Sequence, residues 1–98
     1  MDIVKNSNGT SLNIALIGRL DTITAPALDK ELKESLPGVE NLAFDFSKLE
    51  YISSAGLRVL LGAQKVMNKQ GSMTLSNING DIMEVLEITG FSDILTII

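Results

Sequence analysis

Strand-like and helix-like hydrophobic patterns alternate along the whole sequence, and this alternation limits the fold more than any other feature. Alternating strands and helices require crossover connections, which favour a mainly parallel sheet with helices packed on it. Asn8-Gly9 is a strong signal for a tight hairpin, so the first strand should pair antiparallel with the second. We expect strands at residues 3–6, 10–17, 42–46, 72–76 and 94–98, and helices at about 24–36, 54–69 and 79–89.

The predicted fold class is α/β, with elements in the order ββαβαβαβ and one domain that spans residues 1–98. We expect a mixed, mostly parallel sheet of four to five strands with three helices. A chain of 98 residues suits a single small domain, and it contains no linker, internal repeat or low-complexity stretch.

Local patterns set the expected boundaries. The strand at 10–17 carries apolar residues on both faces, which predicts an inner strand covered on both sides and ended by Gly18. Residues 47–53 should form a loop that leads into the second helix. Polar side chains that begin helical patterns are candidate helix caps: Thr24, Ser53, Ser54, Asn79 and Asp81.

Composition excludes several classes of function. The sequence has no Cys and no His, which removes cysteine nucleophiles, Ser-His triads, thiolate or imidazole zinc sites and disulfides. The net charge is −4 and no Lys/Arg cluster occurs in the sequence, so nucleic acid and anionic membrane are poor candidates as direct partners. No apolar stretch is long enough to span a bilayer, and the N-terminus lacks a signal-peptide pattern. We therefore expect a cytoplasmic protein.

Cofactor and metal motifs are also missing from the sequence. Gly56 and Gly62 lack the Lys-Ser/Thr pair that follows a nucleotide-binding glycine loop. The carboxylates of Asp21, Asp45 and Glu50 do not form a metal-ligand pattern. We expect no cofactor and no metal.

The most informative stretch runs from residue 45 to residue 57 and enters the second helix at Ser53-Ser54. One interpretation is structural: a hydroxyl caps the helix, and the small Ala55 and Gly56 allow close packing. The other is functional: a serine at a helix N-terminus can carry a phosphate, because free amides and the helix dipole favour an anion there.

The same stretch, Asp45-Phe46-Ser47 followed by Ile52-Ser53-Ser54-Ala55-Gly56-Leu57, resembles the signature of STAS domains, specifically of bacterial anti-sigma factor antagonists. Three further runs match: Gly18-Arg19-Leu20-Asp21, Ala25-Pro26 and Ile88-Thr89-Gly90-Phe91. The resemblance covers essentially the whole chain, and its element order agrees with the order predicted above.

The resemblance implies a phosphorylation-switched binding module rather than an enzyme. In the family, the unphosphorylated antagonist binds an anti-sigma factor that is also a serine kinase of the GHKL ATPase type, and this frees a sigma factor. The kinase phosphorylates the antagonist, which weakens the complex, and a metal-dependent serine phosphatase restores it. By position, the modified residue is Ser54, and Asp21 matches a loop acid that lies next to it.

Departures from the family pattern concern the same region. Many antagonists have Asp where Ser53 stands, and Ser or Thr where Ala55 stands, which bears on kinase preference and makes Ser53 a competing site. The chain also stops at the expected fifth strand without the C-terminal helix of many members, so self-association is a further expectation.

The expected partner surface centres on Ser54, with the loop before the first helix and the exposed part of the second helix around it. Lys48 and Arg58 are the only cations near Ser54 in sequence, so a phosphate there should stay outward and hydrated. Two alternatives remain: a STAS adaptor whose serine is not modified, in a signalling or membrane-transport assembly, and a small enzyme that uses Asp21 and Ser54, which the lack of a nearby base disfavours. The candidate partner-binding residues are Asp21, Thr22, Ile23, Ser53, Ser54, Gly56, Leu57 and Arg58.

Overall fold

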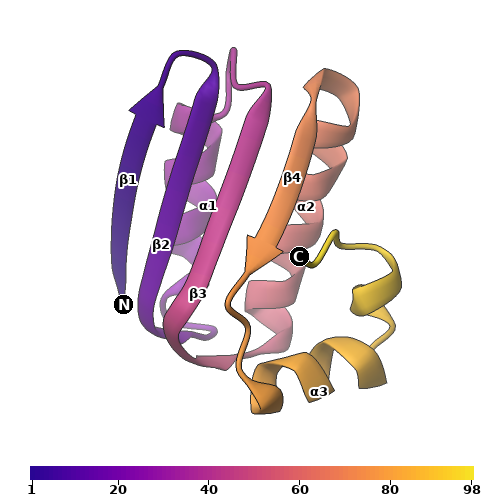
Figure 1. Cartoon of the computed structure of the whole chain (residues 1–98). Helices are drawn as coiled ribbons and strands as arrows, with labels where there is room; N and C mark the ends of the chain where they lie inside the picture. Colours follow the sequence, from indigo (N-terminus) through magenta and orange to yellow (C-terminus); the bar gives the residue numbers. More distant parts are fainter.

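The computed structural model describes residues 1–98 and forms a four-stranded sheet in the order β1-β2-β3-β4 (Figure 1). β1 pairs antiparallel with β2, whereas β2, β3 and β4 are parallel, so the predicted mixed and mostly parallel sheet is confirmed. The elements are β1 (Asp2–Asn8), β2 (Ser11–Leu20), α1 (Ala25–Ser35), β3 (Asn41–Ile52), α2 (Ser54–Gln70), β4 (Ser72–Ser76), α3 (Gly80–Ile88) and a short 3₁₀ helix (Phe91–Asp93).

The predicted hairpin at Asn8-Gly9 is present. Asn8 pairs with Ser11, and Gly9 has a φ of +63°, which a residue without a side chain adopts at little cost. The capping side chain of α3 is Asn79, whose Oδ1 accepts a hydrogen bond from Ile82 N at 2.8 Å. Of the two predicted caps for that helix, Asn79 is therefore the correct one.

Helices α1 and α2 pack side by side on the same face of the sheet (Figure 1). The core lies between this helix layer and the sheet, and it includes an edge-to-face contact between Phe44 and Phe46, whose ring centroids are 6.1 Å apart. The largest fully buried side chains are Ile14, Leu16, Leu20, Leu28, Leu42, Phe44, Phe46, Leu49, Leu60, Met67, Met73 and Leu75.

The prediction that the second strand is covered on both faces is wrong. β2 is an inner strand, but Asn13 on its second face is exposed, and Ala15 and Ile17 are only partly buried. The reason is topological: the chain steps from β2 to β3 to β4 in one direction across the sheet. Crossovers of the same hand in one direction place both helices on the same side, which leaves the other face uncovered.

Two strands extend further than the sequence patterns predicted. β2 continues past Gly18 to Leu20, because a shift of register between Gly18 and Arg19 keeps it paired with β3. Most of the expected loop at 47–53 is also strand, since β3 runs to Ile52 and buries Leu49 and Ile52 in the core. Bulges of this kind interrupt the regular alternation on which the boundaries were predicted.

The expected fifth strand at 94–98 is not formed. The chain makes a 3₁₀ turn at Phe91–Asp93, and only Ile97 bridges to the edge strand, opposite Leu75. The segment is held by Leu95, which is buried in the core, and by two backbone hydrogen bonds to Leu75, from Leu75 N to Thr96 O and from Ile98 N to Leu75 O. The sheet therefore has four strands. None of the helices is long and apolar enough to cross a membrane.

Candidate functional site

The predicted site residues come together where β2 and β3 end side by side. Leu20 is the last residue of β2 and is the register partner of Ile52, the last residue of β3. One residue later, Ser53 N donates a hydrogen bond to Leu20 O at 2.9 Å. The loop that begins at Asp21 and the serine pair that begins α2 therefore leave the sheet from adjacent positions.

The two serines differ in what they present to solvent. Ser54 is the first residue of α2 and is exposed. Ser53 is the N-cap residue, with extended φ and ψ angles of −103° and 174°, but its Oγ is buried and has no hydrogen-bond partner. The prediction that a serine hydroxyl caps this helix is therefore wrong for Ser53, because its hydroxyl points into the protein. Only Ser54 offers an accessible hydroxyl at the helix start.

The loop before α1 is held in one conformation by its own side chains. Asp21 Oδ1 accepts hydrogen bonds from Ile23 N at 3.0 Å and Thr24 N at 3.1 Å. Thr24 Oγ1 accepts from Asp21 N at 2.9 Å and donates to Arg19 O at 2.8 Å. Thr24 is the N-cap residue of α1, yet its hydroxyl does not cap the helix as predicted, because the loop uses it instead.

Charge and exposure at this loop follow from those bonds. The hydrogen bond from the Thr24 backbone N–H is the main cause that lowers the pKa of the Asp21 carboxyl, and the nearby Arg19 guanidinium acts in the same direction. Asp21 is therefore a carboxylate at neutral pH. Thr22 and Ile23 are exposed, and Ile23 is 87% exposed, so a large apolar side chain stands out from an ordered loop.

Sequence reasoning missed Arg19 as part of this site. Its guanidinium carbon lies 4.2 Å from the centroid of the Tyr51 ring, and its Nε lies 3.7 Å from Asp21 Oδ2. Arg19 is the register partner of Tyr51, so the pairing of β2 with β3 places it beside the serine segment. Arg19 is far from Ser54 in sequence, and the signal that points to it is its place in the Gly18-Arg19-Leu20-Asp21 run.

The remaining predicted residues divide between core and surface. A Cβ on Gly56 would lie 2.6 Å from Leu20 Cγ and 3.1 Å from Ile52 Cγ1, so the first turn of α2 packs directly on the strand ends. Leu57 is 4% exposed and belongs to the core. The expectation that Gly56 and Leu57 lie on the partner surface is therefore not met, since both face inward. Arg58 is exposed.

A serine pair at the start of a helix, beside an ordered acidic loop on a four-stranded mixed sheet, defines a small α/β domain of the STAS type. The sequence matches the STAS domain family over residues 2–98, and the chain belongs to that family. The resemblance noted in the sequence is confirmed.

Individual relatives support the same assignment. The chain is 33% identical over 98 residues to the anti-sigma-B factor antagonist of Bacillus subtilis (strain 168). This match covers 99% of this chain and 88% of the relative. It is also 30% identical over 97 residues to the anti-sigma-B factor antagonist of Listeria monocytogenes serovar 1/2a. This match covers 96% of this chain and 84% of the relative.

Solved structures share the fold at lower sequence identity. The unphosphorylated form of the anti-sigma factor antagonist SpoIIAA superposes with a TM-score of 0.78 at 17% identity, covering 99% of this chain and 87% of that one. An anti-sigma factor antagonist from Mycobacterium paratuberculosis gives a TM-score of 0.88 at 18% identity, covering 98% and 83%. At these identities the likeness is one of fold.

The contacts of Gly56 predict that a side chain at this position destabilises the fold. Gly62, the second glycine of α2, serves as the control. Gly56→Ala should lower the free energy of unfolding by about 1–3 kcal/mol, because the added methyl must displace Leu20 and Ile52. Gly62→Ala should raise it by about 0.5–1 kcal/mol, because a Cβ there meets nothing within 4 Å and alanine favours the helix. Urea unfolding of both variants measures the difference. Equal effects would contradict the close packing at Gly56.

The lowered pKa of Asp21 predicts a pH dependence of stability. A carboxyl whose pKa is lower in the folded than in the unfolded chain stabilises the fold above the unfolded pKa, and this contribution is lost as the pH falls through the folded pKa. Asp21→Asn keeps the Oδ1 acceptor but does not titrate. The variant should therefore lose less stability than the wild type as the pH falls below 3.8, the ordinary pKa of this group. Urea unfolding as a function of pH tests this, and parallel curves for the two proteins would refute it.

Proposed function

We propose that this chain is an anti-sigma factor antagonist that is switched by phosphorylation of Ser54. Its partner is an anti-sigma factor that is also a serine kinase of the GHKL type. The unphosphorylated protein binds this kinase and releases a sigma factor, and a serine phosphatase reverses the modification. The names of the relatives in Bacillus and Listeria support the antagonist role. The likeness to SpoIIAA in its unphosphorylated and phosphorylated forms is consistent with a fold that accepts the modification.

The observation that carries the proposal is the difference between the two serines. A kinase must reach the oxygen that it phosphorylates, and Ser54 is exposed whereas Ser53 Oγ is buried. Ser54 also opens the helix α2 of 17 residues, where unpaired N–H groups and the helix dipole stabilise an added negative charge. A phosphate at Ser54 should therefore leave the fold intact and act on binding.

The surface around Ser54 has the properties of a protein-binding site. The loop that carries Thr22 and Ile23 is fixed by internal hydrogen bonds, so little conformational entropy is lost when a partner orders it further. Ile23 supplies an exposed apolar anchor and Arg58 a nearby charge. Ser53, Gly56 and Leu57 support this surface from beneath.

The charges around Ser54 suggest how a phosphate would weaken the complex. Arg19 is already engaged by Asp21 and Tyr51, which leaves Arg58, one turn further along α2, as the unpaired cation nearest to Ser54 in sequence. Asp21 adds a negative charge to the same end of the sheet. Burying a phosphate dianion against a partner without matched cations loses several kcal/mol of hydration, which reduces affinity by orders of magnitude.

Two variants at Ser54 test the switch. Ser54→Ala should bind the kinase in the presence of ADP as tightly as the unmodified protein, because it lacks the modifiable hydroxyl and adds no charge. Ser54→Asp should bind at least about tenfold more weakly, because it places a charge at the centre of the interface. Isothermal titration against a purified GHKL-type anti-sigma factor from the same genome gives both affinities, and thermal unfolding checks that both variants are folded.

Intact-mass measurement after incubation with the kinase and ATP identifies the modified serine. The wild type and Ser53→Ala should each gain one phosphate, and Ser54→Ala should gain none. Phosphorylation of Ser54→Ala would reject the assignment of the site. Equal affinities of Ser54→Ala and Ser54→Asp for the kinase would reject the switch and leave a STAS adaptor as the function.

A further inference from the structure

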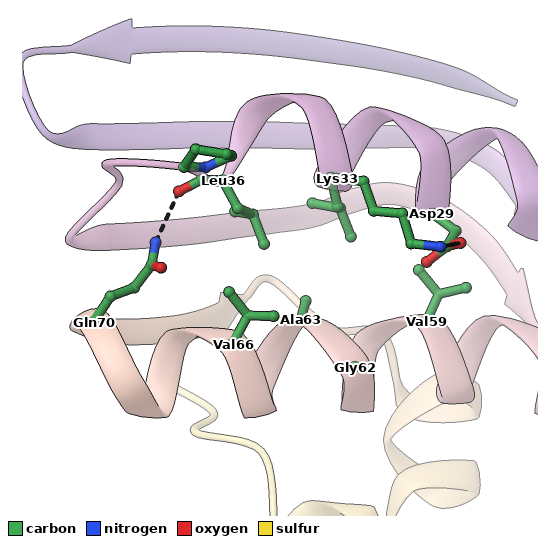
Figure 2. Close-up of a pocket in the computed structure, with 10 residues that line it drawn as sticks. Asp29, Lys33, Leu36, Val59, Gly62, Ala63, Val66 and Gln70 are labelled. Atoms are coloured by element: carbon green, nitrogen blue, oxygen red, sulfur yellow. Dashed lines mark hydrogen bonds and ion pairs between the residues drawn. The ribbon is translucent and has the colours of Figure 1, made fainter.

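An open groove of about 330 Å³ lies between helices α1 and α2, on the side of the helix layer that faces away from the sheet (Figure 2). Its lining is mainly apolar: Val59, Ala63 and Val66 come from α2, Leu32 comes from α1, and Leu36 directly follows α1. The sequence patterns gave α2 more apolar residues than one sheet-facing stripe requires. Most of them are buried, and two that are not lie here: Val59 is partly exposed and Val66 is 42% exposed.

Two features keep this groove open. Gly62 lies between Val59 and Val66 on α2, and a Cβ at Gly62 would meet nothing within 4 Å. At one end, Gln70 Nε2 donates hydrogen bonds to Leu36 O at 2.7 Å and Val39 O at 2.6 Å, which ties the end of α2 to the segment after α1 (Figure 2). The helices are thus held together at that end while the groove stays unfilled between them.

A row of cations runs along α2 beside the groove. Arg58, Lys65 and Lys69 are all exposed, and α2 contains no acidic residue. Residues four, seven and eleven positions apart lie on one side of a helix, so these three form a single row that passes Gly62 and Val66. None of the three takes part in an ion pair. A chain of net charge −4 therefore presents a continuous positive strip next to apolar surface.

The other wall of the groove is neutral. On α1, Lys33 Nζ pairs with Asp29 Oδ2 at 2.9 Å at the groove edge (Figure 2). The charge that a ligand meets therefore comes from the α2 side alone. A ligand that matches this site has an apolar face for the groove and negative charge on the flank that overlies α2.

We propose that the groove between α1 and α2 is a docking site for an acidic amphipathic helix of a partner protein. Val59 to Gln70 spans about 16 Å along α2, which accommodates the apolar residues of two helical turns at positions i, i+4 and i+7. Glutamates or aspartates beside them face the Arg58, Lys65 and Lys69 row. Arg58 also belongs to the surface around Ser54, whereas the groove, Lys65 and Lys69 lie further along α2, and docking there does not require Ser54 to be modified.

A pair of synthetic helical peptides tests the charge requirement. Both carry leucines at i, i+4 and i+7 and alanines at most other positions; along one flank the first has glutamates and the second has lysines. Fluorescence anisotropy with the full chain should show binding of the acidic peptide at least about tenfold tighter than that of the basic one. The affinity should fall as salt rises, because the exposed charges are screened.

Variants locate the site on the protein. The double variant Lys65→Glu/Lys69→Glu should bind the acidic peptide about tenfold more weakly, since two attractions become repulsions. Val66→Ser should also weaken binding. The matched controls Lys48→Glu and Ile88→Ser change exposed residues of the same types outside α1 and α2 and should leave binding unchanged. Thermal unfolding shows which variants are folded.

Several outcomes would overturn the proposal. Equal binding of the two peptides, or equal effects of groove and control variants, would remove the acidic helix as the occupant. Sedimentation that shows a dimer dissolved by Val66→Ser would assign the groove to a second copy of this chain. Binding to phosphatidylglycerol vesicles that Lys65→Glu/Lys69→Glu abolishes, with no binding of the acidic peptide, would assign the surface to a membrane.

Discussion

The hydrogen bond from Ser53 N to Leu20 O joins the start of α2 to the end of β2, and the candidate site depends on it. The absence of a side chain at Gly56 favours this bond, because the first helical turn can lie directly on Leu20 and Ile52. The same contact fixes where α2 begins relative to the sheet, and so it places Ser54 beside the loop that begins at Asp21. A closely packed helix start thus carries an exposed serine, and this packing gives the proposed modification site a firm base.

Much of this arrangement could be predicted from periodicity and turn residues. The alternating patterns predicted a mixed sheet with three helices, and Asn8-Gly9 and Asn79 predicted a turn and a cap that are present. The errors in strand boundaries have a common cause, because each depended on a long-range pairing that local patterns do not encode. A register shift lets β2 continue past Gly18. At the end of the chain only Ile97 bridges to β4, so the expected last strand does not form.

The candidate site was predictable in part for the same reason. The family resemblance in the Ser53-to-Leu57 run identified the segment. Which of its side chains reach solvent depends on how α2 packs, and Leu57 is buried. Arg19 lies more than thirty positions from Ser54 in sequence and reached the site only through the pairing of β2 with β3. The cations of α2 were likewise scattered along the sequence, and the helical repeat gathered them into one row.

The empty space at Gly62 has a consequence for how this protein can diverge. Gly62 borders the groove, and a methyl group added there would touch neither the core nor the strand ends that seat Ser54. Groove depth is therefore adjustable by one substitution at almost no expense in folding. For the proposed docking helix, residue 62 is therefore a position where the fit to the groove can change without altering the packing beneath Ser54.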